Sequence, residues 1–175
     1  MTNAELLEYN KHREICQICI AVDRDILTVL DEWVDKLKVG PWTVMTMSNE
    51  TVRDACLGGT PITEPFKYFC ALAMYGNVQI EIVQNVYGPV PAQEFLARRG
   101  EGLQHFKEKI SDTNMDARVM ELEAVGFART FSGGIKEDVF INFDTERSLG
   151  CALEIGNYAD ISVTKDMYFI YPRED

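Results

Sequence analysis

Two glutamates interrupt apolar segments of this chain. Glu81 lies within GNVQIEIVQ and Glu154 within GCALEIGN, each near the middle of a run that is typical of a β-strand. Burying a carboxylate costs several kcal/mol unless a charged group meets it. A divalent cation is the simplest common partner for two carboxylates, an imidazole and an amide oxygen, so we ask whether the chain brings such groups together.

Two further segments predicted as strands supply the imidazole and the amide. Gln17 lies in EICQICIAV and His105 in GEGLQHF. Successive side chains of a strand point to opposite faces, so the apolar residues of each strand pack on one side. The other side of the four strands then carries the four polar residues Gln17, Glu81, His105 and Glu154. Leu103 and Lys107 are expected on the same side as His105. Lys107 is either a solvated charge at the rim or a cation in the cavity, where burial would lower its pKa.

The order of the predicted elements repeats once along the chain. Strands are predicted over 14–22, 42–47, 66–75 and 78–84, with a helix over 26–37, and again over 102–110, 127–132, 139–143 and 151–156, with a helix over 114–125. An irregular loop, with some strand, is expected over 49–64. The pattern predicts an α+β fold in which paired βαβββ modules form one curved eight-stranded mixed sheet, with helices on the outside and a concave inner face.

The same pattern divides the chain into four parts that together form one domain. A helix occupies 1–13, the first module 14–88 and the second module 89–158, and 159–175 form a C-terminal tail with a short apolar segment over 167–171. The second module opens with a proline-rich linker and a short helix over 92–99. Gly and Pro residues mark most of these boundaries.

Charge and composition exclude several classes of partner. A net charge of −11 disfavours binding to nucleic acid or to an anionic membrane. No apolar run is long enough to cross a bilayer, and the N-terminus lacks the apolar core of a secretion signal, so we expect a cytoplasmic protein. The odd number of cysteines argues against a disulfide framework. Cys16 and Cys19 spell C-x-x-C, but residues three apart on a strand face opposite ways, so both are interpreted as buried core residues.

The four segments that carry the polar residues resemble the metal-bearing strands of vicinal-oxygen-chelate proteins, particularly the methylmalonyl-CoA epimerase-like members. The resemblance covers roughly residues 14–156. It implies a divalent metal ion (Co, Ni, Zn, Mn or Mg) held by Gln17, Glu81, His105 and Glu154. Epimerases of this type usually have His at the first of these positions, and Gln there is more similar to glyoxalase I.

The resemblance also implies a reaction and an assembly. An epimerase or racemase of this type moves a proton on the carbon next to a carbonyl through a metal-stabilised enolate. Glu154 or Glu81 would be the base, with Lys107 as a second candidate. The substrate would be an acyl-CoA or a small ketone, including aromatic ketones of the isoflavanone type. The alternatives are a glyoxalase I-like lyase and a non-catalytic protein that binds a small molecule. Family members are frequently homodimers, so we expect a homodimer.

Overall fold

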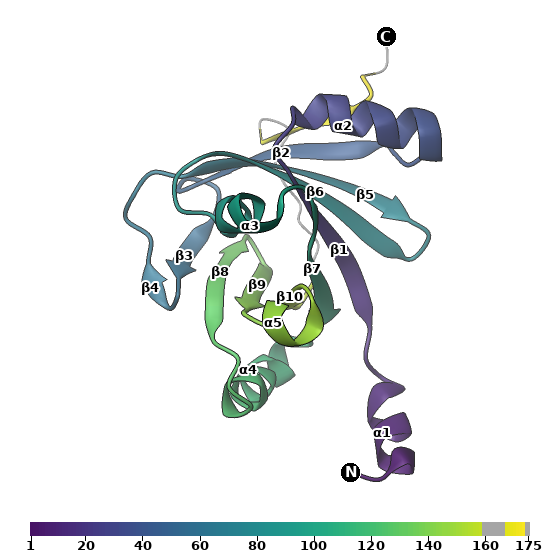
Figure 1. The fold of residues 1–175 in the computed structure, drawn as a ribbon, viewed down its shortest axis with the longest axis vertical. Coiled ribbons are helices and arrows are strands. Elements are labelled where there is room, and N and C mark those ends of the chain that lie inside the picture. The colour runs from purple at the N-terminus through teal and green to yellow at the C-terminus, as the bar shows by residue number, and fades with distance from the viewer. Residues whose placement is uncertain (159–166, 174–175) are drawn as a thin grey trace.

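One mixed sheet curves around a concave face (Figure 1). Helices α2 (Ile26–Glu32) and α4 (Met115–Ala124) cover its outer side, as predicted, whereas α3 (Pro91–Arg99) packs on the concave side. The computed structural model describes residues 1–158 and 167–173. The first half of the sheet contains β1 (Ile15–Val22), β2 (Trp42–Ser48), β5 (Lys67–Tyr75) and β6 (Val78–Tyr87). The second half contains β7 (Gly102–Lys109), β8 (Arg129–Ile135), β9 (Asp138–Phe143) and β10 (Ala152–Gly156). The predicted α+β class and the single curved sheet are confirmed.

The two halves are connected in the same way. In each, the first strand pairs in parallel with the last, β1 with β6 and β7 with β10. The remaining pairs within each half are antiparallel, and the halves join through the antiparallel pair of β1 and β7. The observed order of elements therefore follows the predicted repeat. The boundaries at 14–88 and 89–158 stay a prediction.

The prediction of eight strands is too low, because the described residues contribute eleven. The additional strands are β3 (Arg53–Leu57), β4 (Thr60–Pro61) and β11 (Tyr168–Tyr171). β3 and β4 form a hairpin within the predicted irregular loop, and its two-residue turn is Gly58-Gly59, with φ of 56° and 78°. Positive φ at both turn positions suits a tight hairpin. β11 comes from the apolar segment of the tail and pairs with β2. Residues 159–166 and 174–175 of the predicted tail lie outside the described residues.

The hairpin explains why the sheet must curl. β3 follows β2 in sequence after only residues 49–52, yet it pairs with β8 at the other end of the sheet. Five residue steps of extended chain span at most about 18 Å. The two ends of the sheet must therefore approach each other, which gives the inner face its cup shape.

The helices largely match the predicted segments. They are α1 (Asn3–Asn10), α2 (Ile26–Glu32), α3 (Pro91–Arg99), α4 (Met115–Ala124) and the unpredicted α5 (Glu146–Leu149). The helix predicted over 26–37 changes at Trp33 into a π-helical turn that ends at Leu37, and a 3₁₀ turn over Asp112–Asn114 precedes α4. Within the described residues, no helix combines the length and the apolar character needed to cross a membrane.

Three groups of buried side chains form the core. One lies between α2 and the first half of the sheet, around Leu30, Trp42 and Ile82. A second lies between α4 and the second half, around Phe143 and Ile155. The third fills the concave side, and its members include Cys19, Met47, Phe66, Phe131 and Phe140. The apolar faces predicted for the first, fourth, fifth and eighth of the eight strands thus pack beneath the helices, which leaves their polar residues to the cup.

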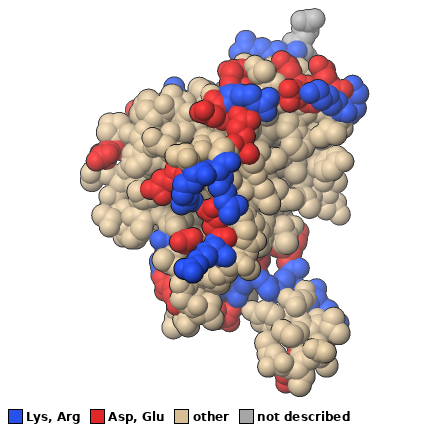
Figure 2. Space-filling view, in the orientation of Figure 1, with Lys and Arg blue, Asp and Glu red and all other residues tan. Residues whose placement is uncertain are grey.

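Positive and negative side chains alternate on the face drawn in Figure 2. Two arginines at the end of α3, Arg98 and Arg99, each lie 2.6 Å from a carboxylate oxygen of Glu146 in α5. These basic groups are therefore paired with a carboxylate, as expected for a surface with an excess of acids.

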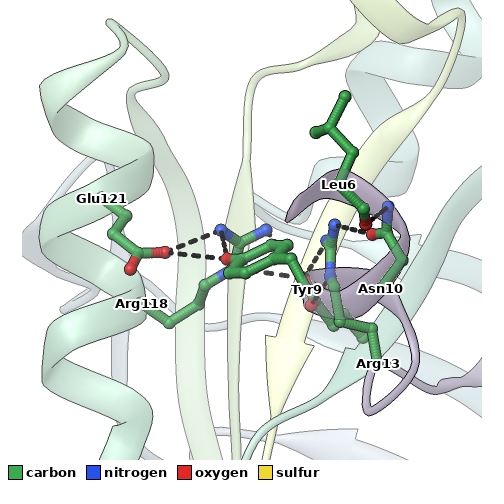
Figure 3. Close-up of polar contacts among 7 residues, drawn as sticks. Leu6, Tyr9, Asn10, Arg13, Arg118 and Glu121 are labelled. Atoms are coloured by element: carbon green, nitrogen blue, oxygen red, sulfur yellow. Dashed lines mark hydrogen bonds and ion pairs between the residues drawn. The ribbon is translucent and has the colours of Figure 1, made fainter. Parts of the chain in front are cut away.

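The N-terminal helix is attached to α4 through a polar cluster. Tyr9 contacts Arg118 and Glu121 of α4, and the guanidinium of Arg13 lies over the Tyr9 ring (Figure 3). Beneath them, the buried carboxylate of Glu108 accepts hydrogen bonds from Arg13 and Arg118 at 2.5–3.2 Å. Burial raises the pKa of Glu108, but the two guanidinium groups outweigh it and leave that pKa below the ordinary value.

Replacing Glu108 by Gln is expected to lower the free energy of unfolding at neutral pH by about 1–3 kcal/mol, since it removes a buried carboxylate that accepts hydrogen bonds from two guanidinium groups. A depressed folded-state pKa adds stability above the unfolded-state pKa, and that stability is lost as the pH falls through the folded-state pKa. The difference between wild type and Glu108→Gln in urea denaturation should therefore shrink in acid.

A matched control is Glu123→Gln, which removes an exposed partner of Arg129. Its effect should stay within about 1 kcal/mol at every pH. A difference between wild type and Glu108→Gln that does not change with pH would contradict the assigned role of the Glu108 carboxylate.

Candidate metal centre

The four polar residues predicted as ligands meet at one point on the concave face. The Nε2 atom of His105 lies 3.3 Å from Glu81 Oε2, 3.4 Å from Glu154 Oε2 and 3.5 Å from Gln17 Oε1. Gln17, His105 and Glu154 are buried, and the Glu81 side chain is 14% exposed. The structure therefore brings together all four, from four different strands.

Strand register creates this meeting point. In one row across the sheet, Gln17 of β1 lies opposite Lys107 of β7, which in turn lies opposite Glu154 of β10. In the next row on the same face, Cys19 lies between Glu81 of β6 and His105 of β7. Residues two apart on a strand share a face, so both rows present their side chains to the cup.

Each predicted ligand is oriented by a neighbour. The Gln17 amide donates to Gln79 Oε1 at 2.7 Å, which leaves its own oxygen directed at His105. His105 Nδ1 lies 2.5 Å from Gln104 Oε1, an acceptor, so Nδ1 carries the proton and Nε2 is left to bind.

The two carboxylates are held in the same manner. The Asn142 amide donates to Glu154 Oε2 at 2.7 Å, and the Cys70 thiol donates to Glu81 Oε1 at 3.1 Å. The Oδ1 atom of Asn142 is buried without a hydrogen-bond partner among the described residues. All four ligand groups thus have a second partner that fixes their orientation, as groups around a bound metal usually do.

A bulge in β7 places Gln104 in this set. In the pairing with β1, Cys19 lies opposite His105 but Ile20 lies opposite Leu103, so Gln104 is an extra residue. Gln104 is buried and lines the cavity, whereas Leu103 is 47% exposed and does not. The expectation that Leu103 shares the cavity side with His105 is therefore wrong, because strict alternation does not hold through a bulge.

Lys107 is a buried cation and not a solvated charge at the rim. The residue is 3% exposed, and its Nζ lies 3.2 Å from Glu154 Oε1 and 3.5 Å from Asp138 Oδ2. Burial alone lowers the pKa of Lys107, but the carboxylates of Glu154, Asp138 and Glu81 outweigh it and raise that pKa. The expected lowering is wrong for this reason. A Cβ at Gly156 would lie 2.4 Å from Lys107 Cε, so the glycine provides room for this side chain.

The ionic groups also shift the pKa values of the imidazole and of Glu81. Burial lowers the pKa of His105, but the carboxylates of Glu154 and Glu81 more than offset it and the pKa is raised. Burial raises the pKa of Glu81, while the hydrogen bond and charge of His105 and the Cys70 thiol bring it below the ordinary value. The imidazole and the two carboxylates therefore favour each other's charged forms.

The donor set fits a divalent cation. Three carboxylates, of Glu81, Glu154 and Asp138, and one ammonium, of Lys107, leave a net charge of −2 when His105 is neutral. Two ligands at about 2.1 Å from one ion, at the angles of octahedral or tetrahedral coordination, lie about 3.0–3.4 Å apart. The 3.3–3.5 Å separations around His105 Nε2 approach this spacing.

A cavity opens from this centre to solvent, and its empty space together with its open mouth is about 690 Å³. Besides the polar residues, its walls are mainly apolar and include Met45, Met47, Leu72, Val83, Phe131 and Phe140. A centre of charged groups at the base of an apolar cavity is typical of a small-molecule site.

Several residues of the site were not found from the sequence. Asn142 interrupts the apolar run VFINF in the same way as the two glutamates interrupt theirs, and that signal could have identified it. Asp138 and Cys70 gave no such signal. Cys19 was interpreted as a core residue, yet its Sγ and the ligand atoms of Glu81 and His105 all lie within 4.8 Å of one another.

Comparison with known proteins supports the fold. No protein-family model matches the chain, and no curated protein matches it by sequence. Among solved structures, hypothetical protein BH1468 from Bacillus halodurans C-125 is 19% identical, with a TM-score of 0.60 over 88% of this chain and 100% of that one. Methylmalonyl-CoA epimerase from Mycobacterium tuberculosis is 18% identical, with a TM-score of 0.59 over 83% and 88% of the two chains.

A third similar structure is a variant of Streptomyces coelicolor methylmalonyl-CoA epimerase in complex with 2-nitronate-propionyl-CoA. It is 15% identical, with a TM-score of 0.59 over 86% of this chain and 97% of that one. At these identities the likeness is one of fold. The predicted resemblance to methylmalonyl-CoA epimerases is confirmed at the level of the fold.

Replacing Lys107 by Met is expected to lower the free energy of unfolding of the metal-free protein by about 3 kcal/mol, because two buried carboxylates lose a cation. Thermal or urea unfolding measures this loss. Lys109→Met is the matched control, since Lys109 lies on the same strand but is exposed, 3.9 Å from Glu14. The control should change stability by less than about 1 kcal/mol. Equal stability of the two variants would contradict a buried ion pair at Lys107.

Proposed function

We propose that this chain is an isomerase, an epimerase or racemase that moves a proton on the carbon next to a carbonyl. The observation that carries the proposal is the convergence of Gln17, Glu81, His105 and Glu154 at the base of a mainly apolar cavity. The likeness in fold to methylmalonyl-CoA epimerases supports the reaction class. The four residues would hold a divalent cation.

The chemistry requires stabilisation of charge on oxygen and a base near carbon. A proton next to a carbonyl is weakly acidic, so negative charge that develops on the oxygen must be balanced. A divalent cation, when bound, supplies this balance as a Lewis acid toward the carbonyl oxygen. The protein must supply the base and must exclude water from the reacting carbon, for which the apolar walls are suited.

Glu81 is the better candidate for the base. Glu154 is held by the Asn142 amide at 2.7 Å and by the Lys107 ammonium at 3.2 Å, so both of its oxygens are engaged by strong donors. Glu81 is held by His105 and by a thiol, which is a weak donor, and it is more exposed to the cavity. We therefore assign proton transfer to Glu81 and a fixed ligand role to Glu154.

Lys107 serves as a charge partner in this scheme. Its ammonium lies 3.2 Å from Glu154 Oε1 and 3.5 Å from Asp138 Oδ2, so it is engaged by two carboxylates. Such a group orients the Glu154 carboxylate and balances part of its negative charge. The sequence interpretation of Lys107 as a second candidate base is therefore not retained in the proposal.

The cavity favours an uncharged substrate. Its apolar walls suit a small ketone. Among the described residues that line the cavity, Lys107 is the one lysine or arginine, and its ammonium is already engaged by carboxylates. A substrate with its own carboxylate would need a further cation. We therefore propose a neutral carbonyl compound, including aromatic ketones, in preference to an acyl-CoA with a charged acyl group.

The substrate class is tested by proton exchange in deuterium oxide. Neutral aromatic and aliphatic ketones are expected to incorporate deuterium at the carbon next to the carbonyl, followed by mass spectrometry, and chiral ones should racemise. Acyl-CoA thioesters with a charged acyl group serve as the comparison. Exchange with those thioesters alone would reverse the substrate assignment, and tight binding of ketones without exchange would favour a non-catalytic binding protein.

The roles of the two carboxylates are separated by paired variants. Glu81→Gln is expected to reduce exchange about 100-fold or more while the protein retains its metal, since an amide cannot accept the proton. Glu154→Gln is expected to weaken metal binding about tenfold or more. Glu123→Gln, on the surface, controls for the substitution itself. Full exchange activity in Glu81→Gln would overturn the assignment of the base, and elemental analysis of each variant reports the metal.

A further inference from the structure

Cys19 occupies the position between two of the proposed ligands. It lies on the central strand β1, opposite Glu81 on one neighbouring strand and His105 on the other, and it is 0% exposed. Gln17 lies two residues earlier on the same face. The thiol therefore comes from the middle of the two rows that build the site.

The ligand atoms confirm this position. The Cys19 Sγ, a carboxylate oxygen of Glu81 and a ring nitrogen of His105 all lie within 4.8 Å of one another, and Cys19 lines the same cavity as the four proposed ligands. Sulfur, carboxylate and imidazole together are a donor set that transition metals bind.

A disulfide does not account for Cys19. Cys70 lies on β5, separated from β1 by β6, and two strand spacings place their Cα atoms about 10 Å apart. A disulfide requires Cα atoms within about 7 Å. Cys16 is absent from the lining of the cavity, and its thiol contacts the backbone oxygen of Lys107. All five cysteines are free.

Packing alone is also a poor account of Cys19. A thiol that only filled core space would be surrounded by apolar groups, whereas this one borders the carboxylate of Glu81 and the imidazole of His105. Cys70 shows the alternative use of a thiol in this site, because it donates to the outer oxygen of Glu81 and so orients it. Cys19 differs from Cys70 because its thiol lies near both Glu81 and a ring nitrogen of His105, two of the proposed ligands.

We infer that Cys19 is an additional ligand of the cation, which binds as a thiolate beside Gln17, Glu81, His105 and Glu154. This inference rests on the metal-binding part of the proposed function. On binding, the S–H bond is replaced by a sulfur–metal bond, and the proton leaves to solvent. Thiolate favours zinc, cobalt and nickel over magnesium and manganese, which prefer oxygen ligands. Zinc, cobalt and nickel are therefore the metals that fit this site best.

The test uses the full chain loaded with Co²⁺, whose bond to a thiolate gives a charge-transfer absorption in the near ultraviolet. The wild-type protein is expected to show this band with bound cobalt, and Cys19→Ala and Cys19→Ser are expected to lose it. Zinc affinity, measured by competition with a chelator, should fall about tenfold or more in both variants. Circular dichroism verifies that the variants are folded.

Cys16→Ala and Cys151→Ala are the matched controls, and both should keep the band, because neither residue lines the cavity. Cobalt bound by wild type without the band overturns the inference, whatever the behaviour of the variants, as does a band that survives in Cys19→Ala or disappears in either control. A protein that binds no cobalt would contradict both the proposed metal site and the role of Cys19. A protein that shows the band but catalyses no proton exchange on any ketone would support Cys19 as a ligand and contradict the proposed isomerase.

Discussion

The need to balance buried negative charge governs the inner face of this protein. Glu81, Glu154 and Asp138 lie within a cup whose walls are mainly apolar, and carboxylates in such surroundings are costly without cations and donors. The Lys107 ammonium and the His105 imidazole supply part of the balance. The remaining negative charge is what makes a divalent cation a fitting occupant, and it keeps polar groups at the base of an otherwise apolar cavity.

Several features of the sheet help to balance and orient these buried charges. The register of β1 with β6 and β7 aligns the polar positions in two rows, and the bulge at Gln104 adds an acceptor for the imidazole. Gly156 leaves space for the Lys107 side chain beside β9. Gln79 and Asn142 orient an amide and a carboxylate from the flanks. The neighbours that surround the ligands are thus as much a part of the site as the ligands.

Alternation along a strand was enough to predict which faces carry Gln17, Glu81, His105 and Glu154, because the period of two is fixed by backbone geometry. The contacts of Lys107 could not be predicted in this way. Its exposure depends on which strands lie on each side of β7 and on the absence of a side chain at Gly156, and a single sequence does not encode these relations as a local pattern. The bulge that brings in Gln104 has no composition of its own.

In the fold, too, local patterns in the sequence predicted some elements and contacts between distant residues determined others. Eight strands stood out because apolar residues repeat along them and turns separate them. β3 and β4 did not, because they are short and partly exposed, and because β3 finds its pairing partner β8 far along the chain. β11 likewise depends on an edge of the sheet that β2 provides. Local patterns therefore predicted the strands that build the cup and missed those that extend its two ends.

The β3–β4 hairpin connects the two halves of the sheet. It lies in the first half of the sequence but pairs with β8 of the second half, so its hydrogen bonds join the two halves of one polypeptide. Exchanging a half between two chains would require those hydrogen bonds to be broken or exchanged as well. Within the described residues, all four proposed ligands of the centre come from a single molecule.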